Sequence, residues 1–194
     1  ESFSRCQYEE KGDFVNQPYE VEIKEQTGQT EIHLRRDGRI WVGSDWIPLT
    51  VEKILSVPRE GAEFEILYRL WNRHNQKTEV FFGVEFNLSA LEGGFDNCRS
   101  FVKGEHPKET ELNSTLNVSN ATAFGIRDSA THLEIVIQSR TPATLWSFPI
   151  ETVSVSESGL EKNYQSSVIF PNWHLELPPG EPVEVRLVKR ISEL

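Results

Sequence analysis

Three carboxylates could take part in chemistry: Glu85, Glu151 and Glu157. Glu85 falls in an apparent strand with apolar neighbours, and the other two fall in the segment 145–170. Two carboxylates across a groove can act as acid and base in sugar chemistry. The competing interpretation is that Glu85 is a strand carboxylate held by backbone or arginine partners, because a buried ionised group must be paired to persist. The residue pattern favours this second interpretation.

The five tryptophans are a second signal. Sugar rings stack on exposed aromatic faces, whereas buried aromatic rings add contact area to a core. Trp71 and Trp173 lie in strand-like segments, so we expect them in the core. Trp41 and Trp46 flank the turn-rich residues 43–45 and could be exposed, since turns rather than strands tend to carry binding groups.

The sequence gives no support for a metal or cofactor site. Its five histidines are scattered, and none has a second ligand at zinc-like spacing. It contains no phosphate-binding loop, nucleophile elbow, C-x-x-C pair or dinucleotide fingerprint. We therefore expect neither a metal nor a cofactor.

Composition narrows the range of partners. The 194 residues carry a net charge of −10 and have a pI near 5.0, which argues against binding to nucleic acid and weakly against anionic membranes. No apolar run approaches membrane-spanning length. Only two cysteines are present, Cys6 and Cys98, and we interpret them as free thiols of a cytoplasmic protein. We expect no nucleic-acid or membrane partner.

Strand-like alternation dominates the chain. Residues 19–25 and 30–36 alternate, with Val21 and Ile23 predicted to face inward. Asp37-Gly38 predicts a tight turn, and 62–71 is clearly amphipathic. The segment 78–91 is interpreted as a central strand covered on both sides. Residues 92–122 form either a functional loop or a region with short irregular strands.

These patterns predict an all-β sandwich. The polar, irregular start of the chain and the absence of methionine indicate a piece of something longer. We interpret residues 1–17 as a linker from an upstream domain and residues 18–194 as a single β-sandwich domain.

Three blocks of sequence resemble one known family. The first ends in HLRRDGR at Arg39 and is followed by Val51-Glu52-Lys53. The second is FFGVEFNL within 78–88, and the third, within 123–165, contains FGI and LWSFPIETVSVSESGLEKNYQ. Together they resemble the C-terminal β-sandwich domain of the α-amylase/4-α-glucanotransferase enzymes of glycoside hydrolase family fifty-seven. Order and spacing hold from about residue 14 to the end of the chain.

This resemblance implies a large twisted antiparallel β-sandwich of the galactose mutarotase-like supersandwich type. In the family, catalysis belongs to an N-terminal barrel, and no stretch of this chain looks like that barrel. The resemblance therefore implies no catalytic residue here and a chain that is not an enzyme alone. Its expected partners are that barrel, on the same polypeptide, and an α-glucan or maltooligosaccharide.

The matched polar residues and the tryptophans together give a candidate site for carbohydrate or for the neighbouring domain. Its members are Trp41, Trp46, Glu85, Asn87, Trp146, Glu151, Glu157 and Gln165. The resulting hypothesis is a non-catalytic accessory domain with a structural role and a possible α-glucan-binding role. The alternatives are a stand-alone mutarotase-like sugar epimerase, which would need a His/Glu catalytic pair, and a pure interaction module that binds no glucan.

Overall fold

The computed structural model describes residues 2–89, 97–156 and 159–194. Apart from a short 3-10 turn, η1 (Phe3–Arg5), its elements are strands. They are β1 (Glu20–Gln26), β2 (Gln29–Val42), β3 (Asp45–Pro58), β4 (Glu63–Asn72), β5 (Thr78–Gly83), β6 (Phe86–Leu88), β7 (Cys98–Gly104), β8 (Lys108–Glu111), β9 (Leu116–Asp128), β10 (Leu133–Ser156), β11 (Gly159–Leu177) and β12 (Pro182–Glu193). The all-β prediction is confirmed.

The chain divides into two compact units. Unit 1 comprises Glu1–Phe81 and His174–Val188, and unit 2 comprises Phe82–Trp173 and Lys189–Leu194. Strands β11 and β12 therefore contribute residues to both units.

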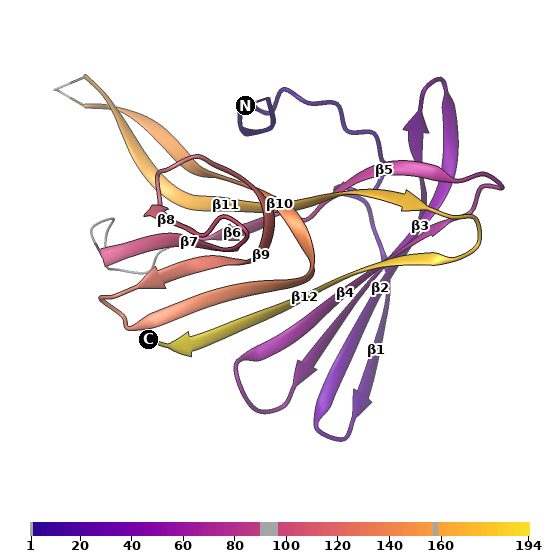
Figure 1. Ribbon diagram of the computed structural model, residues 1–194, viewed down its shortest axis with the longest axis horizontal. Helices are drawn as coiled ribbons and strands as arrows, with labels where there is room; N and C mark the ends of the chain where they lie inside the picture. Colours follow the sequence, from indigo (N-terminus) through magenta and orange to yellow (C-terminus); the bar gives the residue numbers. More distant parts are fainter. Residues whose placement is uncertain (1, 90–96, 157–158) are drawn as a thin grey trace. The chain divides into compact units, whose positions relative to one another are not determined.

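Unit 1 is an antiparallel sheet in the order β1-β2-β3-β4-β12, whose first four strands form a fan in Figure 1. Strands β2 and β3 form a long hairpin, in register from Gln29 opposite Pro58 to Val42 opposite Asp45. The predicted amphipathic segment 62–71 is confirmed as β4, with Ile66, Tyr68 and Leu70 buried on one face. The core of this unit includes Leu49, Val51, Ile66, Leu70, Leu177, Val185 and Leu187.

The tight turn predicted at Asp37-Gly38 is wrong. Strand β2 runs straight through both residues, and the hairpin turns at Gly43-Ser44, where Gly43 has a φ of 64°. A Cβ atom on Gly38 would lie 2.4 Å from Asp13 Oδ1 and 2.9 Å from the ring of Phe14. The glycine therefore lets the N-terminal segment lie against the strand rather than reversing the chain.

The inward orientation predicted for Val21 and Ile23 is also wrong, since they are 59% and 63% exposed. Both residues lie on β1, which ends the strand order of unit 1 and pairs with β2. An alternating pattern marks one face of a strand, but it does not say whether another layer covers that face.

Unit 2 contains an antiparallel sheet in the order β10-β9-β7-β8, with β11 paired to the other side of β10. Its largest fully buried side chains are Leu112, Phe124, Val136, Ile137 and Leu145. The prediction of one continuous strand over 78–91 is wrong, because the backbone leaves strand geometry at Val84 and Glu85, between β5 and β6. Within 92–122, the described residues form β7, β8 and the start of β9.

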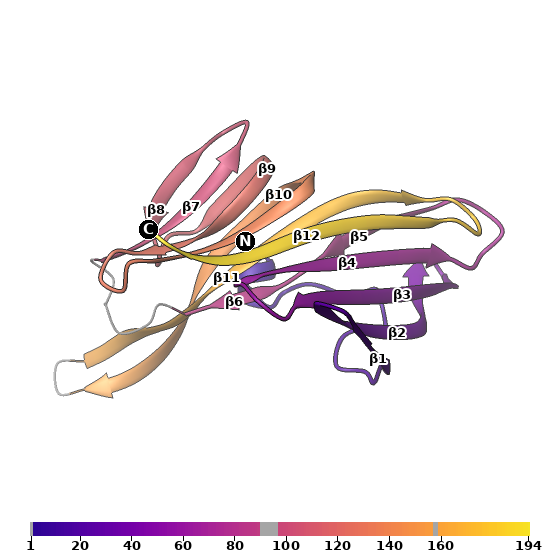
Figure 2. The same ribbon diagram turned by 90° about the horizontal axis from the view of Figure 1, so that it is seen from below.

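The segment 145–170 lies on a pair of antiparallel strands. Strands β10 and β11 run antiparallel from Thr144 opposite Asn172 to Ser156 opposite Gly159, with a bulge between Ile150 and Glu151. In Figures 1 and 2 they form a two-stranded ribbon that extends away from the β7, β8 and β9 strands of the same unit.

Candidate functional site

Trp41 and Trp46 form an exposed aromatic pair near the end of the β2–β3 hairpin. They lie directly opposite each other in the register, and their ring centroids are 4.1 Å apart at an interplanar angle of 30°. Trp41 is 37% exposed and Trp46 is 40% exposed. Since cross-strand neighbours of a twisted hairpin point to the same face, the short turn at Gly43-Ser44 is what brings the two rings together.

The N-terminal segment supports this end of the hairpin. The Trp41 amide donates to the Lys11 carbonyl at 2.7 Å, and the Asp13 amide donates to the Arg39 carbonyl at 3.1 Å. The Asp13 carboxylate accepts from the Arg39 amide at 2.8 Å. The backbone of β2 next to the tryptophans is therefore paired on both sides, which fixes the position of the aromatic pair.

A guanidinium group accompanies the pair. Arg39 lies over the Trp46 ring, 4.8 Å from its centroid, and its side chain is 59% exposed. An aromatic surface beside a fixed set of N–H donors suits a ligand that is flat and apolar on one side and rich in hydroxyls at its edge, as a glucose ring is. Arg39 ends the first matched sequence block, but the candidate site predicted from the sequence did not include it.

Glu85 and Asn87 do not occupy a continuous buried strand. Glu85 lies at the break between β5 and β6 and Asn87 lies in β6; both side chains are exposed, and Asn87 Nδ2 donates to Glu85 Oε1 at 3.0 Å. The interpretation of Glu85 as a strand carboxylate with backbone or arginine partners is therefore wrong. Its exposure removes the need for a charged partner.

Trp146, Glu151 and Gln165 lie on the β10–β11 hairpin. Trp146 is half-buried and stacks on Phe170, with centroids 5.7 Å apart. Glu151 is exposed and pairs with Lys162 at 3.2 Å, and Gln165 Nε2 donates to Thr152 Oγ1 at 3.1 Å. Glu157 lies outside the described residues. Strand β6, which carries Asn87, pairs with β11, which carries Gln165, so the described members in unit 2 lie on adjoining strands or at the break before β6.

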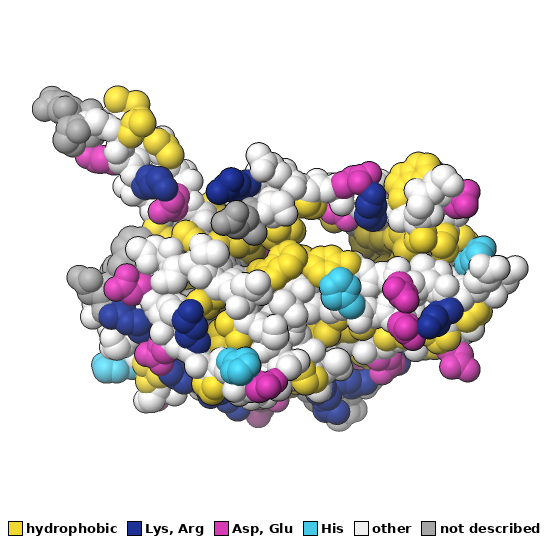
Figure 3. All heavy atoms as spheres, turned by 45° about the horizontal axis from the view of Figure 1, so that its top comes forward, with side chains coloured by type: hydrophobic (Ala, Val, Ile, Leu, Met, Phe, Trp, Pro, Cys, Tyr) yellow, Lys and Arg dark blue, Asp and Glu magenta, His cyan; other side chains and the backbone are white. Residues whose placement is uncertain are grey.

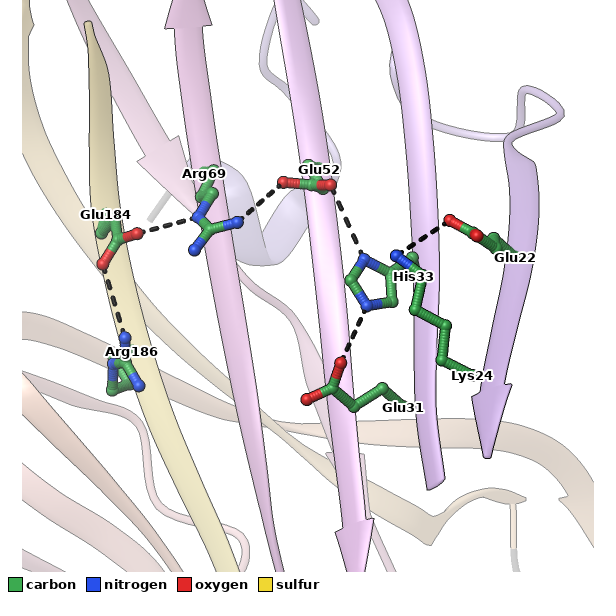
Figure 4. A network of polar contacts seen from close by, with 8 residues as sticks. All are labelled: Glu22, Lys24, Glu31, His33, Glu52, Arg69, Glu184 and Arg186. Atoms are coloured by element: carbon green, nitrogen blue, oxygen red, sulfur yellow. Dashed lines mark hydrogen bonds and ion pairs between the residues drawn. The ribbon is translucent and has the colours of Figure 1, made fainter. Parts of the chain in front are cut away.

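A network of charged side chains lies on one face of the unit 1 sheet (Figure 4). It was not predicted from the sequence. His33 lies between two carboxylates, with Nε2 3.1 Å from Glu31 and Nδ1 3.8 Å from Glu52. Arg69 pairs with Glu52 at 3.4 Å and with Glu184 at 2.8 Å. The hydrogen bond from Arg69 holds the pKa of the Glu184 carboxyl below its usual value. The sequence signal for this network is the presence of opposite charges at positions that face each other on neighbouring strands.

Lys53 lines a hollow of about 310 Å³ on the other face of that sheet, together with Tyr19, Leu34, Val51 and Tyr68. Leu34 and Tyr68 are its direct cross-strand neighbours, and its ammonium group lies 5.6 Å from the centroid of the Tyr68 ring. Burial lowers the pKa of the Lys53 ammonium group. None of the lining residues is acidic, so this hollow is a mostly apolar surface with one cation.

Two further observations concern the described part of the chain. Its His, Cys, Asp and Glu side chains form no group of three that could hold a metal ion. In residues 2–89, 97–156 and 159–194 no helix has the length and apolar character needed to cross a bilayer.

Sequence comparison places the chain among known proteins. A family model described as "Alpha-amylase/4-alpha-glucanotransferase, C-terminal" matches residues 1–187. A 4-alpha-glucanotransferase of Thermococcus litoralis is 30% identical over 88% of this chain and 22% of its own length. An alpha-amylase of Pyrococcus horikoshii is 29% identical over 82% of this chain and 20% of its own length. The chain thus spans about a fifth of the length of these relatives.

Two solved structures are similar to the chain in fold. The crystal structure of the Thermococcus litoralis 4-alpha-glucanotransferase matches with a TM-score of 0.68 and 27% identity, covering 100% of this chain and 25% of that one. A galactose mutarotase-like protein of Clostridium acetobutylicum matches with a TM-score of 0.60 and 12% identity, over 92% of this chain and 68% of that one. The second likeness shows the fold alone and confirms the predicted galactose mutarotase-like sandwich.

Proposed function

Since the chain belongs to the alpha-amylase/4-alpha-glucanotransferase C-terminal domain family, and not to the catalytic part of those enzymes, we propose that it serves an α-glucan-processing enzyme as an accessory domain that binds α-glucan. The observation that carries the binding role is the exposed Trp41–Trp46 pair with Arg39 beside it. The proposed ligand is an α-glucan or maltooligosaccharide.

The proposed binding mode follows from the order of the three side chains. Trp46 has Arg39 over its ring and the tilted ring of Trp41 against it, so a sugar ring would meet the exposed side of Trp41. The exposed guanidinium of Arg39 would then donate to hydroxyl groups further along the ligand. Because the backbone around the pair is already hydrogen-bonded, little ordering would be needed on binding, which favours affinity.

The proposed partner is the catalytic part of the same polypeptide, a barrel in the family that the chain resembles. Residues 1–17 would lead to the domain from that part, with 11–13 pairing along β2 before the chain enters β1. We place the protein in the cytoplasm, in keeping with Cys6 and Cys98, both present as free thiols. The stand-alone epimerase hypothesis rests on a fold likeness at 12% identity, which does not carry that activity to this chain.

Titration calorimetry with maltoheptaose tests the binding role. We expect saturable heat at millimolar ligand for the native chain, and its loss when Trp41 and Trp46 are both replaced by alanine. The absence of heat in a chain with native circular dichroism would contradict the proposal. Competition by glucose polymers with other linkages would show whether the site selects α-glucans.

A further inference from the structure

The outer part of the β10–β11 hairpin is an exposed two-stranded ribbon. Every residue in 150–155 and 159–163 is exposed. The strands remain in register here, with Thr152 opposite Asn163 and Val155 opposite Leu160. In Figure 3 the same ribbon projects at the upper left and carries hydrophobic side chains along its outer part.

The two faces of this ribbon differ in chemistry. One face carries a row of hydroxyl and amide groups that bond to one another, with Asn163 Nδ2 donating to Ser154 Oγ at 3.0 Å and Gln165 Nε2 donating to Thr152 Oγ1 at 3.1 Å. Glu161 lies directly opposite Ser154 on this face. We call Thr152, Ser154, Glu161, Asn163 and Gln165 the polar face.

The opposite face holds three aliphatic side chains, Val153, Val155 and Leu160, which are 62%, 83% and 76% exposed. Val155 and Leu160 are direct cross-strand partners and Val153 lies two residues before Val155, so the three side chains are contiguous. We call this set the aliphatic face. Lys162 lies directly opposite Val153 on the same face and pairs with Glu151, so this ion pair adds no net charge to that face.

Such a ribbon is unfavourable in water. A two-stranded ribbon with no covering layer is marginally stable, and contiguous exposed aliphatic side chains on such an element are typical of interaction sites. The hydroxyl and amide groups of the polar face bond to one another, whereas the aliphatic side chains leave apolar surface in water, so the aliphatic face is the one that gains from being covered.

We infer that the aliphatic face of Val153, Val155 and Leu160 docks on the catalytic part of the same polypeptide. This rests on the proposed function, in which the domain works beside such a part. The relatives contain about four-fifths of their length outside the region that matches this chain, which supplies a permanent neighbour. A second copy is disfavoured because each chain carries a net charge of −10, so two copies repel each other.

Site-specific cross-linking in the parent enzyme tests this inference. The photoreactive residue p-benzoylphenylalanine is introduced at the position of Val155 or, as the matched control, at that of Ser154, its neighbour on the polar face. We expect the Val155 position to cross-link to the catalytic part and the Ser154 position to give far less of that product. Equal yields from both positions, no product from Val155, or a product with a second copy would each overturn the inference.

A second measurement uses substitutions that keep strand propensity. Val153→Thr, Val155→Thr and Leu160→Thr together make the aliphatic face polar and place β-branched side chains, which favour strands, at all three positions. In the parent enzyme we expect amide exchange in the ribbon to quicken by about tenfold or more. The matched control is Val21→Thr with Ile23→Thr, two aliphatic residues on β1 that are also exposed, and it should leave ribbon exchange unchanged.

An unchanged exchange rate in the triple variant would contradict docking through this face. Glucan binding distinguishes this failure from failure of the proposed function, because the triple variant leaves Trp41 and Trp46 intact. Loss of docking with retained binding of maltoheptaose is the expected result. Absence of glucan binding in the native protein would contradict the proposed binding role. The cross-linking result would still decide whether the aliphatic face docks on the catalytic part.

Discussion

Arg39 and Trp41 both contact the indole ring of Trp46. The guanidinium carbon of Arg39 lies 4.8 Å from the centroid of the Trp46 ring, and the Trp41 ring lies 4.1 Å from it. Trp46 therefore contacts both a cation and a second aromatic ring, and the sugar contact that we propose is the exposed side of Trp41.

Removing Trp41 should therefore weaken glucan binding most. We expect Trp41→Ala to cost about 1–2 kcal/mol of binding free energy, as for an aromatic anchor, and Arg39→Gln to cost about 0.5–1 kcal/mol. Phe81→Ala, which removes a ring that is 47% exposed in the same unit, is the control and should leave affinity unchanged. Calorimetry with maltoheptaose measures all three, and equal affinity in Trp41→Ala and the native chain would exclude this platform.

Gly38 should tolerate no side chain, although it lies in ordinary strand geometry. A Cβ atom would approach Asp13 Oδ1, which already accepts from the Arg39 amide, so the N-terminal segment would have to move. We expect Gly38→Ala to lower the free energy of unfolding by about 1–3 kcal/mol in urea denaturation. Gly43→Asn is the control, because it has open space and a φ that asparagine adopts. Equal stability of both variants would refute this explanation of Gly38.

Asp128 should make the protein sensitive to acid. Burial opposes its ionisation, but hydrogen bonds from the Thr131 and Ala130 amides outweigh burial and hold its pKa below the usual value. A carboxyl group with a lowered folded pKa contributes stability that is present above its unfolded pKa of about 3.9 and lost as pH falls through the folded pKa.

Asp128→Asn should therefore have a lower urea midpoint than the native chain at about pH 7, with the difference shrinking below about pH 4. Urea titrations across this range measure it. A difference that stays constant from neutral to acid pH would show that the carboxylate charge plays no part.

Lys53 should destabilise the fold at neutral pH. Burial lowers the pKa of its ammonium group, so the unfolded state holds more protons between the folded pKa and the unfolded value of about 10.4. The resulting penalty is present below the folded pKa and disappears as pH rises through this window. Lys53→Met should raise the urea midpoint at about pH 7, and its advantage should shrink towards about pH 10. A variant less stable than the native chain would mean that the contact with Tyr68 outweighs burial.

Local pattern was a good guide where one face of a strand meets the core. The alternation of 62–71 predicted β4, and Trp173, expected in the core, is 5% exposed. The same reasoning failed for Val21 and Ile23, because alternation does not reveal that a strand lies at a sheet edge. It failed for Asp37-Gly38 because a glycine required by a close approach from distant residues looks the same as a glycine required by a turn.

The sequence predicted which residue types belong to the candidate site better than it predicted which of those residues lie together. The exposure suggested for Trp41 and Trp46 is confirmed, since both flank a real turn. The contact between their rings depends on strand register, and the contact of Arg39 with Trp46 depends on a diagonal cross-strand position, neither of which local sequence specifies. Trp146 was expected on a binding surface, yet one of its neighbours is the stacked ring of Phe170.

Nuclear magnetic resonance of the indole Nε1–H groups during titration with maltoheptaose is the most direct test of the glucan-binding role. The five tryptophan signals can be assigned by single Trp→Phe substitutions. We predict saturable shifts for Trp41 and Trp46 and none for the buried Trp173. Unchanged Trp41 and Trp46 signals at millimolar ligand would contradict the account.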